Sequence, residues 1–137
     1  MIRFATPADL PWLQAHDHHV APVELATLIS LGRVLIAQEG DEPVGWLRWN
    51  LFWDNTPFMN MLYILEPWQR RGIGRRLVNR WESQARETGF TAVMTSTQAN
   101  EEAQHFYRKL GYRDAGVLLL PGEAAEIIFH KELTAHA

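Results

Sequence analysis

A turn rich in glycine and arginine, set between an apolar segment and an amphipathic one, constrains this chain more than any other feature. Phe58 to Leu65 predicts a buried strand, and residues 69–74 follow it with the sequence QRRGIG. Apolar side chains then recur every fourth residue, which predicts a helix over 72–88 with one apolar stripe: Ile73, Leu77, Trp81 and Ala85. Its polar face is expected to hold Arg75, Arg76, Arg80, Glu82 and Arg86. A further apolar segment at 91–96 completes a strand-helix-strand order, which predicts a right-handed parallel crossover.

The turn at 69–74 suits a phosphate ligand. The first turn of a helix leaves backbone N–H groups without intrahelical partners, and the helix dipole adds partial positive charge there. Glycine lets the backbone approach a ligand closely because it has no Cβ atom. A purely turn-forming role is the competing interpretation. A Rossmann fingerprint fails, because the position three after Gly74 holds Leu77 instead of glycine.

The remaining pattern predicts a mixed sheet flanked by helices. Further helices are expected at residues 7–15, 22–31 and 101–110, the first with a capping box at Thr6 and Asp9. Further strands are expected at 2–4, 34–38, 44–52, 116–120 and 126–131, and the segments 34–38 and 44–52 should form an antiparallel hairpin. No repeat or linker interrupts the 137 residues, so we interpret the chain as a single domain over 1–137 of the α/β (α+β) class.

Composition excludes several classes of protein. The absence of cysteine excludes a disulfide scaffold, a thiolate zinc site and a cysteine nucleophile. The formal net charge of −3 argues against a nucleic-acid partner. Residues 69–80 nevertheless hold arginines and no acid, which indicates a specific anionic ligand or a solvated helix face. No signal sequence or membrane-spanning run is visible, so we expect a cytoplasmic protein without a membrane partner.

The histidine-rich segment at residues 16–19 resembles a metal site only at first sight. It reads His16-Asp17-His18-His19. Adjacent residues at a helix end rarely converge on one ion, and no fourth ligand pattern accompanies them. We therefore expect no metal, and these side chains either border a substrate site or are simply solvated.

Two motifs together resemble the GNAT superfamily of N-acetyltransferases. Residues 69–74 match the pattern Gln/Arg-x-x-Gly-x-Gly/Ala, after the alternating strand residues Leu62 and Ile64. A second block is similar to the segment Asn-x-x-Ala-x-x-Leu/Phe-Tyr-x-x-Leu-Gly-Phe/Tyr, through Asn100, Ala103, Phe106, Tyr107, Leu110, Gly111 and Tyr112. One departure is Pro67, since the family often places proline at the position of Glu66. The implied fold is a mixed, mostly antiparallel sheet in which a parallel strand pair splays around the pantetheine of CoA.

The resemblance implies transfer of an acetyl group from acetyl-CoA to a primary amine by direct attack in a ternary complex. Tyr107 matches the general acid that protonates the departing CoA sulfur, and a core tyrosine is its competing role. Asn100 matches a pantetheine contact, and a helix N-cap is its competing role. The residues implied for acetyl-CoA are Ile64, Gln69, Arg70, Arg71, Gly72, Ile73, Gly74, Arg75, Asn100 and Phe106.

These motifs do not identify the acceptor, because family members that share them acetylate either small molecules or proteins. Trp46, Trp53 and Asp54 lie where the family usually places the acceptor, and aromatic rings with an acid suit a cationic amine. Packing is the alternative for the tryptophans. The general base is unidentified, with a water relay or Asp54 as candidates. A non-catalytic acyl-CoA-binding module is the alternative function, and the exposed tryptophans and last strands would suit a homodimer.

Overall fold

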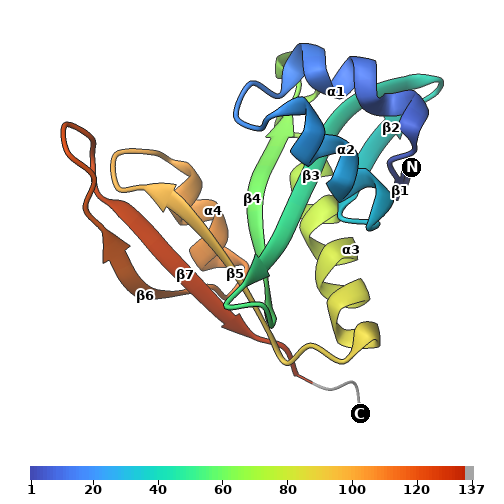
Figure 1. Ribbon diagram of the computed structural model, residues 1–137. Helices are drawn as coiled ribbons and strands as arrows, with labels where there is room; N and C mark the ends of the chain where they lie inside the picture. The colour runs from blue at the N-terminus through green and yellow to red at the C-terminus, as the bar shows by residue number, and fades with distance from the viewer. Residues whose placement is uncertain (135–137) are drawn as a thin grey trace. The chain divides into compact units, whose positions relative to one another are not determined.

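The predicted order of strands and helices is present in the structure, a computed structural model that describes residues 1–134 (Figure 1). The described strands are β1 (Ile2–Phe4), β2 (Val34–Glu39), β3 (Glu42–Phe52), β4 (Thr56–Ile64), β5 (Ala92–Gln98), β6 (Arg113–Leu118) and β7 (Glu126–Glu132). The helices are α1 (Leu10–His16), α2 (Pro22–Ser30), α3 (Ile73–Thr88) and α4 (Ala103–Lys109), with 3-10 turns η1 (Pro7–Asp9) and η2 (Glu66–Trp68).

The strands form one mixed sheet in the order β1-β2-β3-β4-β5-β7-β6. The hairpin of β2 and β3 is antiparallel, as the turn at residues 40–43 predicts. β4 and β5 pair in parallel through Phe58 opposite Met94 and Met59 opposite Thr95. The predicted parallel crossover through α3 is therefore confirmed in its strand direction, and the GNAT-like fold class is confirmed with it.

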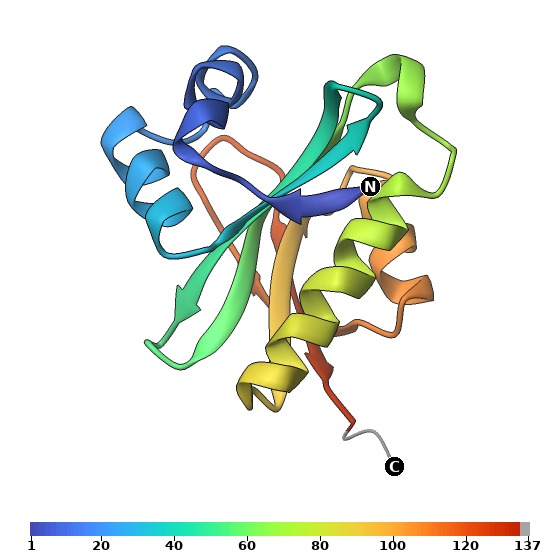
Figure 2. The same cartoon turned by 90° about the vertical axis from the view of Figure 1, so that its right-hand side faces the viewer.

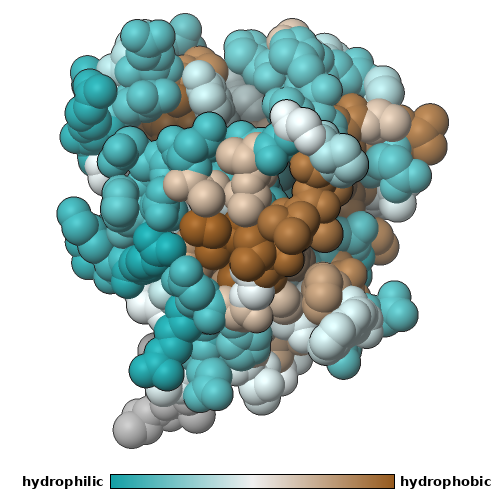
Figure 3. Space-filling model, turned by 90° about the vertical axis from the view of Figure 1, so that its left-hand side faces the viewer, coloured by the Kyte–Doolittle hydropathy of each residue, from teal (hydrophilic) through white to brown (hydrophobic). Residues whose placement is uncertain are grey.

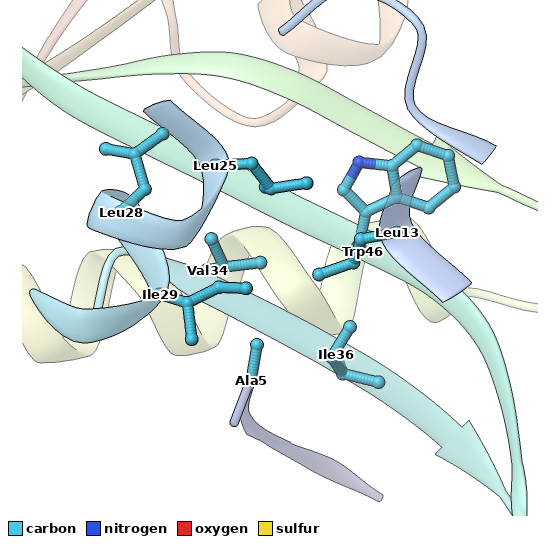
Figure 4. Close-up of a cluster of buried hydrophobic side chains, with 8 residues drawn as sticks. All are labelled: Ala5, Leu13, Leu25, Leu28, Ile29, Val34, Ile36 and Trp46. Carbon is cyan, nitrogen blue, oxygen red and sulfur yellow. The ribbon is translucent and has the colours of Figure 1, made fainter. Parts of the chain in front are cut away.

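The chain consists of two compact units. The first unit comprises Met1–Asn50 with Met61–Trp81, and the second comprises Leu51–Asn60 with the residues from Glu82 onward. In the first unit, α1 and α2 lie over one face of β1–β3, and the first half of α3 lies over the other (Figure 2). Figure 4 shows the buried cluster beneath α1 and α2, formed by Ala5, Leu13, Leu25, Leu28, Ile29, Val34, Ile36 and Trp46. Each fully buried leucine or isoleucine contributes about 1.5–3 kcal/mol to stability.

The first predicted helix is wrong in its bounds, since η1 precedes a shorter α1. Pro11 has no N–H, so it cannot donate to the carbonyl of Pro7 as an α-helix requires. Leu10 donates to that carbonyl instead, which is the shorter 3-10 spacing. The capping role of Asp9 is confirmed, because its carboxylate accepts a hydrogen bond from the N–H of Thr6 at 2.8 Å.

In the second unit, Glu82 is buried, although the sequence places it on the polar side of α3, opposite the apolar stripe. Its Oε2 accepts a hydrogen bond from the Tyr112 hydroxyl at 2.8 Å, and its Oε1 accepts one from Lys131 Nζ at 2.8 Å. Burial together with the carboxylate raises the pKa of Tyr112. This network ties α3 to β7 and to Tyr112, which directly precedes β6.

The edge strand β6 is exposed along its whole length. Its predicted bounds, 116–120, are wrong, because pairing with β7 begins at Arg113 opposite His130 and ends at Leu118 opposite Glu126. Four consecutive apolar side chains at the end of β6 and just after it are at least 44% exposed, namely Val117, Leu118, Leu119 and Leu120. Figure 3 shows hydrophobic side chains gathered at the surface of one side of the molecule.

Candidate active site

The turn between β4 and α3 has the open backbone that the sequence predicts. Gly72 has φ +80, and a Cβ atom built there would meet nothing within 4 Å. Arg70 also adopts a left-handed conformation, with φ 62, which is uncommon for a residue with a side chain. α3 begins directly afterwards at Ile73, and Arg76 donates the early helical hydrogen bond to the Gly72 carbonyl at 3.1 Å. The preceding N–H groups, of Ile73, Gly74 and Arg75, are therefore the ones that a helix start leaves for a ligand.

Side chains within the loop hold this turn in place. Gln69 Nε2 donates a hydrogen bond to the Ile64 carbonyl at 2.8 Å, which links the start of the motif to the end of β4. The Arg71 guanidinium lies 5.0 Å from the centre of the Trp68 ring. Neither contact was predicted, because both depend on the loop path rather than on residue spacing. The link to Ile64 indicates why the motif begins with glutamine.

The cationic residues of the turn fit a pyrophosphate. Arg70, Arg71, Arg75 and Arg76 are all exposed, and the segment 69–80 contains no acid that would neutralise them. Exposed guanidinium groups beside free helical N–H groups are the usual protein environment of a phosphate group. The open space around Gly72 leaves room for a ligand to approach the backbone. Ile64 and the residues from Gln69 to Arg75, all predicted to contact acetyl-CoA, lie in one continuous segment of the first unit.

Tyr107 lies in the second unit, on α4, and only 6% of it is exposed. Its ring packs against Tyr112 at 5.7 Å and Phe129 at 6.0 Å between centroids. Burial raises the pKa of Tyr107 to about 12, while a hydrogen bond with Thr95 lowers it in part and the charge of Glu101 raises it further. The hydroxyl is therefore protonated at neutral pH, as a proton donor must be. The expected core packing is present as well.

Two further residues of the second unit, Asn100 and Phe106, were predicted to contact acetyl-CoA, and both precede Tyr107 on the chain. Phe106 is half-buried, and its ring centroid is 5.3 Å from that of Tyr107. Asn100 is exposed in the turn before α4. The N-cap of α4 is Glu102, so the interpretation of Asn100 as an N-cap is wrong.

The acceptor candidates fall in different settings. Trp46 is 2% exposed and belongs to the buried cluster of the first unit. Trp53 is 80% exposed, in the tight turn that joins β3 to β4. Trp53 and Asp54 adopt left-handed φ values of 53 and 63 there, and Asn55 N donates to Phe52 O at 3.2 Å. Such a turn matches the twist of a hairpin, at a cost in backbone strain for a tryptophan.

Asp17 is a buried ion-pair partner that the sequence interpretation missed. Its Oδ2 accepts hydrogen bonds from Arg48 Nε at 2.6 Å and Trp46 Nε1 at 3.0 Å. Its Oδ1 accepts from Arg48 Nη2 at 3.3 Å and from the His19 N–H at 3.2 Å. Burial alone would raise the pKa of Asp17, but these hydrogen bonds and the charge of Arg48 lower it overall. The sequence held one signal for this pair, since Arg48 lies between apolar residues of a predicted strand and a buried arginine needs an acidic partner.

The described residues contain no group of three or more His, Cys, Asp or Glu side chains that could hold a metal ion. Within the same residues, no helix is long and apolar enough to cross a membrane.

Comparison with known proteins places these features in one family. The model of the acetyltransferase (GNAT) family matches residues 5–112. The Bacillus subtilis protein YyaT is 25% identical over 111 residues, which cover 81% of this chain and 73% of YyaT. Among solved structures, Ard1 from Thermoplasma volcanium superposes with a TM-score of 0.85 at 17% identity, covering 98% of this chain and 97% of Ard1. The Salmonella typhimurium protein yncA, solved with its cofactor acetyl-CoA, superposes with a TM-score of 0.80 at 19% identity, covering 100% of this chain and 95% of yncA.

Proposed function

Because this chain belongs to the GNAT family of acetyltransferases, we propose that it transfers the acetyl group of acetyl-CoA to a primary amine in a ternary complex. The observation that carries this proposal is the turn before α3. Its open Gly72, free helical N–H groups and exposed arginines together fit the pyrophosphate of CoA.

The residues that would hold acetyl-CoA follow from their position in the motif. The backbone from Arg70 to Arg75 would bind the pyrophosphate, with Gln69 keeping the turn against Ile64. The Ile64 backbone would bind the pantetheine, with Asn100 and Phe106 as further contacts. When bound, acetyl-CoA supplies an acetyl group activated as a thioester.

Tyr107 would act as the general acid. Its hydroxyl remains protonated at neutral pH because burial raises its pKa to about 12. A protonated hydroxyl can give its proton to the departing CoA sulfur, a contribution of about 10²–10⁴-fold in rate. The contact of Trp46, Trp53 and Asp54 with the acceptor, which the resemblance implies, stays a prediction. We propose that both units act together as one acetyltransferase domain over residues 1–137.

The test is release of free thiol from acetyl-CoA in the presence of a panel of primary amines. An acetyltransferase should release thiol with at least one amine, and mass spectrometry should find that amine acetylated. A shift of Tm with CoA, but no thiol release with any amine, would instead support the acyl-CoA-binding module.

A further inference from the structure

A cluster of aromatic rings lies in the first unit beside the strand assigned to the pantetheine. Trp12 and His16 stack one helical turn apart on α1, with ring centroids 4.2 Å apart. Trp46 of β3 meets Trp12 at 5.5 Å and His16 at 6.4 Å. Tyr63 of β4 lies 5.5 Å from Trp46 and directly precedes Ile64. We call these four side chains the aromatic surface.

Three of these four rings reach solvent. His16 is exposed, Tyr63 is 46% exposed and Trp12 is half-buried, while Trp46 is 2% exposed and lies beneath them. The exposed rings therefore stand on a rigid floor, since Trp46 is fixed by the hydrogen bond from its Nε1 to Asp17. A set of rings held in this way can bind a ligand without being reordered.

The hydrogen bonding of His16 leaves one of its nitrogens as a proton acceptor. Nδ1 lies 2.7 Å from the carbonyl oxygen of Trp12. A carbonyl only accepts hydrogen bonds, so Nδ1 must carry the hydrogen and neutral His16 has its lone pair on Nε2. Among the described residues, none of the hydrogen bonds of His16 uses Nε2. The imidazole is thus oriented with its basic nitrogen available.

The charges beneath the aromatic surface cancel each other. Both oxygens of Asp17 accept hydrogen bonds from within the protein, and Arg48 is paired with this carboxylate at 2.6 Å. The Asp17 side chain is 0% exposed and the Arg48 side chain is 6% exposed, so neither is open to pair with a ligand. A cationic amine would therefore be bound by the ring faces. A carboxylate on the same ligand would find no cation within the aromatic surface.

On the basis of the proposed acetyltransferase function, we infer that the aromatic surface binds the acceptor, a primary amine on an aromatic or aliphatic body without a neighbouring carboxylate. His16 Nε2 takes one proton from its ammonium group. In this step an N–H bond of the ammonium breaks and an Nε2–H bond forms, so the positive charge passes to the imidazole. The exposed ring then returns the proton to water. The neutral amine is then formed beside His16, on a surface that extends through Trp46 to Tyr63, the neighbour of Ile64 on the chain.

The first experiment compares acetylation of matched amines. Phenethylamine should be acetylated with a kcat/KM at least about tenfold higher than phenylalanine, which differs only by its carboxylate, because one unpaired charge costs at least a factor of ten. His16→Gln keeps a donor for the Trp12 carbonyl but cannot take a proton, so kcat for phenethylamine should fall about a hundredfold. His18→Gln, two residues further on and also exposed, is the control and should stay within about twofold of the unchanged protein.

A rescue experiment separates a proton acceptor from a structural side chain. In His16→Ala, added imidazole should restore part of the rate, since position 16 is open to solvent. Acetylated phenethylamine is measured rather than thiol, because imidazole itself can accept acetyl groups. Equal rates for His16→Gln and His18→Gln, or a preference for phenylalanine, would overturn the inference.

A binding measurement keeps this inference separate from the proposed function. With CoA present and no acetyl group to transfer, the histidine ring signal that is missing in His16→Gln should shift in NMR spectra on addition of phenethylamine. The same signal should not shift with phenylalanine. If no amine is ever acetylated, the proposed function fails, and this shift alone decides whether the aromatic surface binds amines. If the His16 signal does not shift when phenethylamine is added, the inference that the aromatic surface binds amines is overturned.

Discussion

Gly72 and Gly32 offer a matched pair of single residues, because both have left-handed backbone and open space around them. Their φ values are +80 and +72, and a Cβ atom at either would meet nothing within 4 Å. Replacing either by alanine should destabilise the fold by about 1 kcal/mol through backbone strain. Only Gly72→Ala should weaken CoA binding, because Gly72 lies in the turn that we propose to bind the pyrophosphate. Denaturant unfolding and calorimetric titration with CoA measure the two effects, and equal CoA affinity would argue against this turn as the binding site.

Tyr107 and Tyr112 allow a second comparison between buried tyrosines that pack against each other. Tyr107→Phe should lower kcat about a hundredfold or more, with little change in the Kd of acetyl-CoA, because the substitution removes the proposed acid and keeps the ring. Tyr112→Phe removes the hydrogen bond to Glu82, so it should lower the free energy of unfolding instead. Steady-state kinetics with the best acceptor amine and unfolding curves of both variants are the measurements. An unchanged kcat for Tyr107→Phe would remove its role as the acid.

Single residues also show where sequence interpretation stops. The positions of the glycines and of Tyr107 were sufficient to predict the turns and the helix that hold them. Glycine marks a turn of the backbone, and Tyr107 continues the apolar stripe of a helix. Asp17 was grouped with its neighbouring histidines, since its partner Arg48 lies 31 positions away. Long-range pairing of this kind follows from packing of α1 on β3, which no local pattern encodes.

At the scale of elements, strand β3 carries a glycine, Gly45, where a side chain would collide with β4. A Cβ atom at Gly45 would lie 2.9 Å from the Tyr63 carbonyl oxygen and 2.6 Å from Ile64 Cδ1. The side chain of Ile64 can rotate away, but the backbone oxygen cannot. This glycine therefore sets the position of the strand segment assigned to the pantetheine.

Gly45→Ala should move that segment, and we expect a loss of stability of about 1–3 kcal/mol together with a higher Kd for acetyl-CoA. Gly116→Ala in strand β6 is the control, because a Cβ atom there would meet nothing within 4 Å. Its stability and Kd should match those of the unchanged protein. Unfolding curves and calorimetric titrations measure both quantities. A Gly45→Ala protein with unaltered Kd would show that the pantetheine is held elsewhere.

The order of elements could be predicted because apolar periodicity changes clearly from strands to helices. The ends of these elements were predicted less accurately, because they depend on strand pairing and on the missing N–H group of proline. Pro11 shortens α1, and the length of β6 is set by β7, its hydrogen-bonded partner. The burial of Glu82 on the polar side of α3 could not be predicted, because the helix pattern does not include its partners Tyr112 and Lys131.

At the scale of the whole molecule, carboxylates with lowered pKa values make stability depend on pH. The hydrogen bond from Arg3 lowers the pKa of Asp9. The pKa of Asp17 is also lowered, despite its burial, by its pairing with Arg48. A carboxylate whose pKa is lower in the folded state contributes stability above its unfolded pKa of about 3.9. This contribution is lost as the pH falls through the folded value. We therefore expect the free energy of unfolding to be steady near neutral pH and to fall below about pH 4.

Asp17→Asn should reproduce much of this acid effect at neutral pH. The substitution leaves Arg48 buried without a counter-charge, and breaking a buried ion pair in this way costs about 3–5 kcal/mol. The variant should then lose less additional stability between pH 5 and pH 2 than the unchanged protein, since one titrating group is gone. Asp114→Asn is the control, because its pair with Arg108 is exposed and screened by solvent, so its acid profile should follow that of the unchanged protein. Urea unfolding at each pH gives the three profiles. An Asp17→Asn profile parallel to the control would mean that Asp17 is not the carboxylate that limits stability in acid.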